Sequence, residues 1–334
     1  MEYVKFGNTG IKVSRFCLGV MDFPSRLEKN KSIEIILKAL DKGINFIDTA
    51  DAYGRGLCEE ILGEALTPEK RKKVILTTKF WVKMEKNNLN SGGCSRYHII
   101  RALEESLKRL KTDYIDLYLL HHPDPNTPAE ETLSTLDSLV KQGKVRYLGV
   151  SNHYAWQMAH MLGVSALHNW EPIVAIQCRY NIIDRVIENE TIPFCKRFNI
   201  AMMTYGPLAG GILTGRYKRG ESIPEDSRVA GVSFRKMLTN EVFDLLDEMG
   251  KISERYNIPL NRLSVVWLLS KSYVTSVILG GSKPEHYESI YPALEDHIDE
   301  EDLQKIDELS EKFCYQPFSN QPIKEGAPKA QNWF

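Results

Sequence analysis

The stretch YIDLYLLHHPDPNTPAEETLSTLDSLVKQG, residues 114–143, predicts one strand followed by one helix. Residues 114–121 form an apolar run of the length that is typical of a buried strand. The Thr-Pro-Ala-Glu sequence at 127–130 predicts the helix start, because it combines a hydroxyl N-cap, a proline at the first helical position and a carboxylate. Gly143 is expected to end this helix as a C-cap residue.

This alternation recurs along the chain. Seven further apolar runs of strand length are each followed by a helical pattern, at residues 16–19, 45–50, 74–80, 146–151, 175–181, 201–206 and 276–282. Alternating strands and helices predict a parallel sheet with right-handed crossovers. Eight such units favour a closed (β/α)8 TIM barrel, an α/β fold, over an open sheet. A dinucleotide-binding open sheet would also need a GxGxxG turn after its first strand, and the sequence has none at that place.

An N-terminal β-hairpin is expected before the first unit, because residues 2–19 alternate apolar and polar side chains around an Asn-Thr-Gly turn. Three segments are too long to be plain connectors, namely 82–95, 207–234 and 313–334. The first two follow strands three and seven, which predicts long loops at the C-terminal face, where barrel active sites lie. Since no internal repeat is present, residues 1–334 are predicted to form a single domain. Its C-terminal tail, 313–334, could fold over the active-site mouth, cover a partner surface or be disordered.

The composition is that of an ordinary globular protein, with 43% hydrophobic and 26% charged residues. A formal net charge of −1 argues against nucleic acid or an anionic membrane as a partner, although a local basic cluster could still hold a small anion. No apolar run approaches the roughly 18 residues that span a bilayer. The six cysteines are widely spaced, and no secretory signal opens the chain. These features predict reduced thiols and a cytoplasmic location.

Three neighbouring strands of the predicted barrel each carry one ionisable side chain to the same end. Because alternate strand residues share a face, Asp48, Lys79 and His121 are expected to lie at the C-terminal ends of their strands and to point inward. Tyr53 follows Asp48 in the next loop. A lysine ammonium lowers a tyrosine pKa from about 10, an aspartate keeps the lysine charged, and a histidine can hydrogen-bond a carbonyl oxygen. Such a group could protonate a developing alkoxide while a cofactor supplies hydride.

Each of these four residues also has a structural interpretation when it is taken alone. An aspartate at a strand end is usually a turn or cap residue, and a lysine at a rim is usually a solvated charge. A His-His-Pro sequence is usually a loop, and a tyrosine usually packs or makes a structural hydrogen bond. Their joint placement on successive strand ends favours the functional interpretation.

Several segments resemble the aldo-keto reductase family, in the order and spacing of that family. They are GINFIDTADAYGRGLCEEILGEAL at 43–66, VILTTKF at 74–80, YIDLYLLHHPD at 114–124, RYLGVSN at 146–152, IQCRYN at 176–181 and TYGPLAGGILTGRY at 204–217. The resemblance implies reversible, metal-free reduction of an aldehyde or ketone by a nicotinamide cofactor. It also implies a catalytic tetrad of Asp48, Tyr53, Lys79 and His121, in which Tyr53 donates the proton. His121 is preferred to His122 because the family histidine directly follows the apolar strand.

The same resemblance implies a cofactor site. Ser151, Asn152 and Gln177 fall where the family holds the nicotinamide carboxamide, and Tyr205 falls where an aromatic ring stacks on the nicotinamide. Further residues that the resemblance and the chemistry of phosphate binding place along the cofactor are Gly206, Leu208, Arg216, Arg228, Gly280, Ser282, Lys283 and His286. A merely solvated charge run is the alternative for the arginine-rich loop.

The adenine end departs from the family pattern. His286 takes the position of a family Gln or Arg, and Ser289 and Ile290 take the positions of a Glu-Asn pair. Because Lys283 could neutralise a 2′-phosphate, NADP(H) is the predicted cofactor, with NAD(H) as the alternative. For the substrate, the predicted contacts are Trp81 and Asp22, while the identity of the carbonyl compound and the oligomeric state are not readable from the sequence.

Two other functions compete with reduction. HPDPNTPAEETL, residues 122–133, resembles the potassium-channel β-subunits, which use this barrel as a binding and regulatory partner. Those proteins typically have another residue at the position of His121, so His121 favours an active reductase. The second alternative is a lyase or hydrolase that works without a cofactor. The residues expected to hold the nicotinamide argue against this alternative, because without a cofactor they would have nothing to bind. They are Ser151, Asn152, Gln177 and Tyr205.

Overall fold

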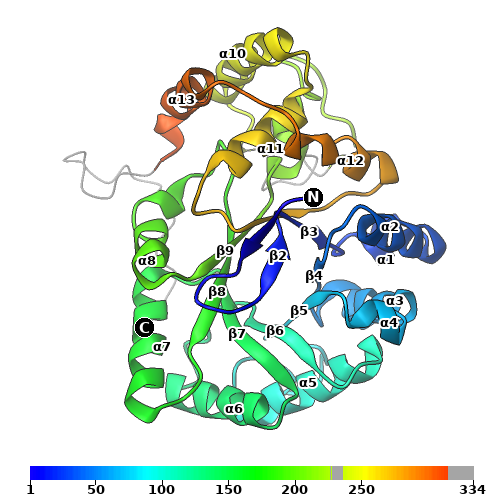
Figure 1. Cartoon of the computed structure of the whole chain (residues 1–334), viewed down its shortest axis with the longest axis vertical. Coiled ribbons are helices and arrows are strands. Elements are labelled where there is room, and N and C mark those ends of the chain that lie inside the picture. The colour runs from blue at the N-terminus through cyan, green and yellow to red at the C-terminus, as the bar shows by residue number, and fades with distance from the viewer. Residues whose placement is uncertain (226, 228–235, 315–334) are drawn as a thin grey trace.

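The computed structural model describes residues 1–225, 227 and 236–314. Its centre is a closed barrel of parallel strands in the order β10-β3-β4-β5-β6-β7-β8-β9 (Figure 1). The strands are β3 Phe16–Gly19, β4 Phe46–Asp48, β5 Ile75–Phe80, β6 Ile115–Leu120, β7 Val145–Ser151, β8 Ile173–Arg179, β9 Ala201–Tyr205 and β10 Ser276–Leu279. Each of the eight predicted runs overlaps one of these strands, although β7 and β8 begin before their runs, so the prediction of a (β/α)8 barrel is confirmed.

The predicted N-terminal hairpin is also present, and it covers the N-terminal end of the barrel. It pairs β1 Tyr3–Lys5 with β2 Lys12–Ser14 in antiparallel register. Gly7 has a φ of +52°, and a Cβ there would meet the backbone of Asn199 and Ala201 at the start of β9. Only glycine tolerates this close approach in that conformation. The opposite, C-terminal end of the barrel is thus the one left for a site.

Helices surround the barrel on its outer side (Figure 1). The α-helices that the structure describes are α1 Phe23–Arg26, α2 Lys29–Asp41, α3 Leu57–Ala65, α4 Pro68–Arg71, α5 Arg96–Leu110, α6 Ala129–Lys141, α7 Ala155–His168, α8 Thr191–Phe198, α10 Asn240–Tyr256, α11 Leu260–Ser270, α12 Pro284–Glu288 and α13 Glu300–Leu309. The 3-10 helices are η1 Tyr53–Gly56, η2 Val186–Glu188, η3 Ala209–Thr214, η5 Tyr291–Leu294 and η6 Glu311–Phe313.

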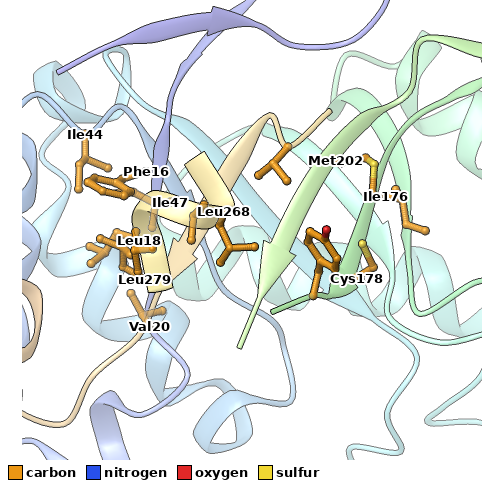
Figure 2. Close-up of a cluster of buried hydrophobic side chains, with 14 of the residues drawn as sticks. Phe16, Leu18, Val20, Ile44, Ile47, Ile176, Cys178, Met202, Leu268 and Leu279 are labelled. Atoms are coloured by element: carbon orange, nitrogen blue, oxygen red, sulfur yellow. The ribbon is translucent and has the colours of Figure 1, made fainter. Parts of the chain in front are cut away.

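The core has two parts because strand residues alternate between two faces. A smaller cluster fills the lumen, where the rings of Phe6 and Phe46 lie 5.5 Å apart at 83°. A larger cluster lies between the strands and the helices, and Figure 2 shows part of it, with Phe16, Leu18 and Ile47 from neighbouring strands gathered together. Each large aliphatic side chain buried in this way contributes about 1.5–3 kcal/mol. The two clusters together hold the strand ends in fixed positions.

Two predicted helix starts are wrong in detail. The helix predicted to be capped by Thr127 is α6, whose N-cap is Pro128, because the Thr127 hydroxyl donates to Asp124 Oδ2 at 2.8 Å instead. The Ser-Lys-Pro-Glu sequence at 282–285 has the same predicted start pattern, but Ser282 precedes α12 by two residues, and the N-cap is Lys283 without a side-chain hydrogen bond. At Thr127, a hydrogen bond to the neighbouring side chain of Asp124 replaces the capping bond.

The long segments at the C-terminal face are present as far as the chain is described. Residues 82–95 form neither helix nor strand, and residues 207–234 begin with η3. Of the predicted tail, only Phe313 and Cys314 are among the described residues. Within the described ranges, no helix has both the length and the apolar composition needed to cross a membrane.

Candidate active site

Three of the four predicted catalytic residues meet at one buried ammonium group. Asp48 ends β4, Tyr53 begins η1, and Lys79 lies near the end of β5. The Lys79 Nζ donates to Asp48 Oδ2 at 2.8 Å, to the Thr49 carbonyl oxygen at 2.7 Å and to Tyr53 Oη at 3.1 Å. All three hydrogens of the ammonium are therefore used. Because Lys79 is completely buried, this full set of acceptors is what allows it to keep its charge.

The protonation states of this group follow from burial and from the ion pair. Burial lowers the pKa of Lys79, but Asp48 and Tyr53 more than offset this effect, so the pKa lies above its ordinary value. Burial raises the pKa of Asp48, and Lys79 opposes the rise. For Tyr53, burial raises the pKa and Lys79 lowers it, with a net rise above 10. The predicted effect of Lys79 is present, but it does not overcome burial, and Tyr53 is protonated at neutral pH.

His121 completes the predicted tetrad directly after β6. The His121 and Tyr53 rings lie edge to face, with centroids 5.8 Å apart at 78°. The His122 ring stacks on that of His121 at 5.0 Å and is tilted against the Trp81 ring at 4.9 Å. Burial, together with the charge of Lys79, lowers the pKa of His121 to about 3. The imidazole is thus neutral and can both donate and accept a hydrogen bond. Its Nδ1 is buried and has no hydrogen-bond partner within the described part of the chain.

Of the residues predicted to hold the nicotinamide, Ser151, Asn152 and Tyr205 are hydrogen-bonded to one another, and Gln177 is hydrogen-bonded to Asp48. Asn152, at a φ of +61°, donates from Nδ2 to Ser151 Oγ and to the His121 carbonyl oxygen, both at 3.0 Å. Its Oδ1 accepts from the Tyr205 hydroxyl at 2.8 Å. Gln177 Nε2 donates to Asp48 Oδ1 at 2.7 Å. The structure therefore places this set beside the tetrad.

Two of these contacts were not predicted from the sequence. The Gln177 amide was expected only near the cofactor, yet it also satisfies the second oxygen of Asp48, from a strand 129 residues further along the chain. The Thr49 carbonyl is the third acceptor of Lys79. A sequence signal exists for Gln177, a polar residue on the inward face of its strand. No sequence signal identifies the Thr49 carbonyl, because every residue has a backbone carbonyl group.

The residues predicted for the phosphates and the adenine lie along one rim, apart from the tetrad. Gly206 has a φ of +68°, and Leu208 is the N-cap of η3. Arg216 is exposed after η3, and Arg228 lies outside the described residues. At the start of α12, the Ser282 N–H donates to His286 Nδ1 at 3.3 Å, and burial and then Lys283 lower the pKa of His286.

At the predicted adenine end, Ser289 and Ile290 differ from the family pattern, and each has a structural role in this fold. Ile290 is buried, and the Ser289 hydroxyl accepts from Asn261 Nδ2 at 3.0 Å. A Cβ at Gly280 would meet no described atom within 4 Å. Neither Ser289 nor Ile290 therefore offers the carboxylate and amide that their positions have in the family, and the adenine end differs chemically as the sequence indicated.

The two predicted substrate residues have different surroundings. Trp81 has a φ of +136°, its carbonyl oxygen accepts from the Gly93 N–H at 2.7 Å, and its ring contacts His122. Strained backbone of this kind is concentrated at functional sites. Asp22 is half-buried at the start of α1 and acts electrostatically on His286. Of these two residues, Trp81 lies nearer to the predicted tetrad, because its ring contacts His122 and the His122 ring stacks on His121.

Comparisons with known proteins agree with this geometry. The model of the aldo/keto reductase family matches residues 15–311. The aldo-keto reductase YhdN of Bacillus subtilis is 35% identical over 324 residues, which are 95% of this chain and 96% of the relative. A probable voltage-gated potassium channel subunit beta of Oryza sativa is 32% identical over 292 residues, 85% of this chain and 88% of the relative. The versiconal hemiacetal acetate reductase of Aspergillus parasiticus is 31% identical over 296 residues, 81% and 86% of the two chains.

Proposed function

Because this chain belongs to the aldo/keto reductase family, we propose that it reduces an aldehyde or ketone to an alcohol, reversibly, with a nicotinamide cofactor. Family membership supports an oxidoreductase that takes a small carbonyl substrate. The observation that carries the proposal is the contact of one buried ammonium, Lys79, with both Asp48 and Tyr53. These contacts place a charged donor against a protonated hydroxyl group, which is the arrangement that proton transfer to a carbonyl oxygen requires.

The proposed mechanism assigns one task to each residue of the tetrad. A nicotinamide cofactor, when bound, would supply the hydride. Tyr53 holds a proton at its hydroxyl, because its pKa lies above 10, and transfers it to the carbonyl oxygen as negative charge develops there. Lys79 stabilises the resulting tyrosinate from 3.1 Å, and Asp48 keeps Lys79 charged and in place. The neutral His121 donates a hydrogen bond that orients the carbonyl.

The residues present fit a nicotinamide cofactor. Ser151, Asn152 and Gln177 offer hydroxyl and amide groups of the kind that bind a carboxamide, and Tyr205 brings an aromatic ring to the same end of the barrel. The unpartnered Nδ1 of His121 shows that the polar groups here are not all satisfied by the described protein. We therefore propose these side chains as the holders of the nicotinamide, with Gly206, Leu208, Arg216, Gly280, Ser282, Lys283 and His286 along the phosphates and adenine.

For the choice between the two cofactors, we expect NADP(H) to bind more tightly than NAD(H), and Lys283→Ala to weaken NADP(H) binding about tenfold. Hydrogen bonds to charged groups contribute about 1.5–3 kcal/mol, and a factor of ten is about 1.4 kcal/mol. The support is the exposed ammonium of Lys283, which acts on His286 at the rim. Isothermal titration of each cofactor measures the effect, with Lys305→Ala on α13 as an exposed lysine control. Equal or tighter NAD(H) binding by the unmodified protein would contradict the preference.

A second candidate function is that of a cofactor-binding regulatory partner with weak turnover. Relatives named as potassium channel subunit beta, at 32% identity over 85% of this chain, are the observation that favours it. The presence of His121 beside Tyr53 supports reduction instead. Cofactor oxidation measured across sugars, short aldehydes, ketosteroids and quinones tests the two. Turnover of any of these carbonyl compounds supports the reductase, and cofactor binding without turnover supports the regulatory role.

Two wider proposals accompany this function. The whole chain is proposed to form one domain, supported by the closure of the barrel between β3 and β10 and by the family match across 15–311. A cytoplasmic location is proposed as well. Its support is the set of widely spaced cysteines, all of which lie in the described part of the chain and carry free thiols.

A further inference from the structure

A buried polar cluster lies outside the barrel wall, behind the turn that carries Tyr53. Its centre is Glu59 of α3, which is completely buried. Glu59 Oε1 accepts from the Thr78 hydroxyl at 2.6 Å, and Glu59 Oε2 accepts from Arg109 Nε at 2.7 Å. The guanidinium of Arg109 therefore compensates the charge of Glu59, and no second cation of the described chain is paired with this carboxylate.

A second carboxyl group in the same cluster lacks such compensation. Asp51 is 1% exposed, and neither of its carboxyl oxygens accepts a hydrogen bond from any described residue. The N–H of the adjacent Ala52 lies near this carboxyl and lowers its pKa, but burial and Glu59 outweigh that effect. The Tyr118 hydroxyl of β6 is buried and equally unpartnered in the described structure, and Asp51 is among the charges that act on it. Asp51 thus has the surroundings of a neutral acid.

The balance of charges around Asp51 also favours its neutral, protonated form. The charged groups that face Asp51 are Glu59 from α3, Arg109 from α5 and Lys79 from β5. Arg109 is paired with Glu59, and Lys79 with Asp48. Two cations therefore face three carboxyl groups, and an ionised Asp51 would be an uncompensated buried charge, which is costly. Burial, and then Glu59, raise the pKa of Asp51 to about 7.

The backbone of Asp51 connects the two parts of the catalytic group. Its N–H donates to the Lys79 carbonyl oxygen at 3.1 Å, and the Tyr53 N–H donates to the Ala50 carbonyl oxygen at 3.2 Å. These bonds hold the turn after β4 against the end of β5. Any movement of Asp51 towards water would pull on this turn, which sets the distance between Tyr53 and Lys79.

From these contacts we propose that Asp51 is a positioning residue whose carboxyl group holds a proton, and that loss of this proton above neutral pH weakens the placement of Tyr53 against Lys79. Only the expected effect on kcat rests on the proposed reductase function. The negative charge gained by Asp51 would also act on Lys79, in competition with the tyrosinate. The protonated carboxyl itself can be observed without any turnover.

The first test is infrared difference spectroscopy of the full chain during a pH titration. A protonated carboxyl group has its own carbonyl stretching band, and we expect one that disappears with an apparent pKa near 7 and is absent from Asp51→Asn. Asp113→Asn, which changes an exposed carboxyl, is the matched control and should leave the band unchanged. A band that persists in Asp51→Asn, or no band near neutral pH in the unmodified protein, would overturn the proposal whether or not the protein is a reductase.

The second test compares stability and kinetics across pH. The folded-state pKa of Asp51 is above its unfolded value, so its contribution to stability is full at low pH and is lost as the pH rises towards 7. The melting temperature of Asp51→Asn relative to the unmodified protein should therefore rise between pH 5 and pH 8. The kcat of the unmodified protein should fall about tenfold per pH unit above 7, and that of Asp51→Asn should not. If Asp51→Asn does not fold, Asp51→Glu should fold and keep the alkaline fall. Parallel melting and pH–rate curves for the unmodified protein and Asp51→Asn would refute the role, and so would an Asp51→Glu variant that folds and shows no alkaline fall in kcat.

Discussion

Replacing Tyr53 by phenylalanine is expected to lower kcat for carbonyl reduction by about 10²–10⁴-fold, the range over which a positioned proton donor acts. The substitution removes only the hydroxyl group, which lies 3.1 Å from Lys79 Nζ. The ammonium keeps Asp48 and the Thr49 carbonyl as acceptors, so the fold should be retained. Cofactor affinity should be unchanged, because the residues proposed to hold the nicotinamide do not bond to Tyr53.

The measurement is steady-state oxidation of NADPH or NADH with a reactive aldehyde, together with the dissociation constant of the cofactor. Tyr97→Phe, which removes an exposed hydroxyl on α5, is the matched control and should behave like the unmodified protein. Turnover of Tyr53→Phe at the unmodified rate would refute the proposed mechanism. Loss of activity with an equal loss of cofactor affinity would also contradict the assignment of Tyr53 to the chemical step alone.

Replacing Lys79 by methionine is expected to abolish most of the activity and to destabilise the protein by about 3–5 kcal/mol. The reason is that Asp48 is 3% exposed and would keep only the Gln177 amide as a hydrogen-bond donor from a side chain. A buried carboxylate without its cation is an uncompensated charge. The proton transfer suffers separately, because no ammonium stabilises the tyrosinate.

Urea unfolding at neutral pH measures the stability, and single-turnover kinetics measure the chemical step. The double variant Lys79→Met/Asp48→Asn separates the two effects. Removing both charges should recover part of the lost stability without recovering activity. A single Lys79→Met variant within about 1 kcal/mol of the unmodified protein would mean that Asp48 is neutral or solvated in the fold, contrary to the buried ion pair.

Much of this site was predictable because it depends on strand periodicity. Inward-pointing residues repeat every second position, so Asp48, Lys79 and His121 could be placed at one end of the barrel before any contact was known. The eight apolar runs of strand length were predictable as well, and each overlaps an observed strand. The helix starts were less well predicted. The Thr127 hydroxyl bonds to Asp124, three residues earlier in the chain, and this local bond competes with capping.

The sequence by itself determined the barrel, the end of the barrel at which Asp48, Lys79 and His121 lie, and the residue types of the proposed tetrad, because all three depend on local periodicity and chain order. Only the tertiary structure decided how the charges are balanced. It brought Gln177 to Asp48, the Thr49 carbonyl to Lys79, and Asp51 beside Glu59. These pairings, and the burial that raises the pKa of Tyr53 despite Lys79, depend on which side chains face each other across closed strands and packed helices. Residue spacing along the chain does not encode those distances or the local exclusion of water.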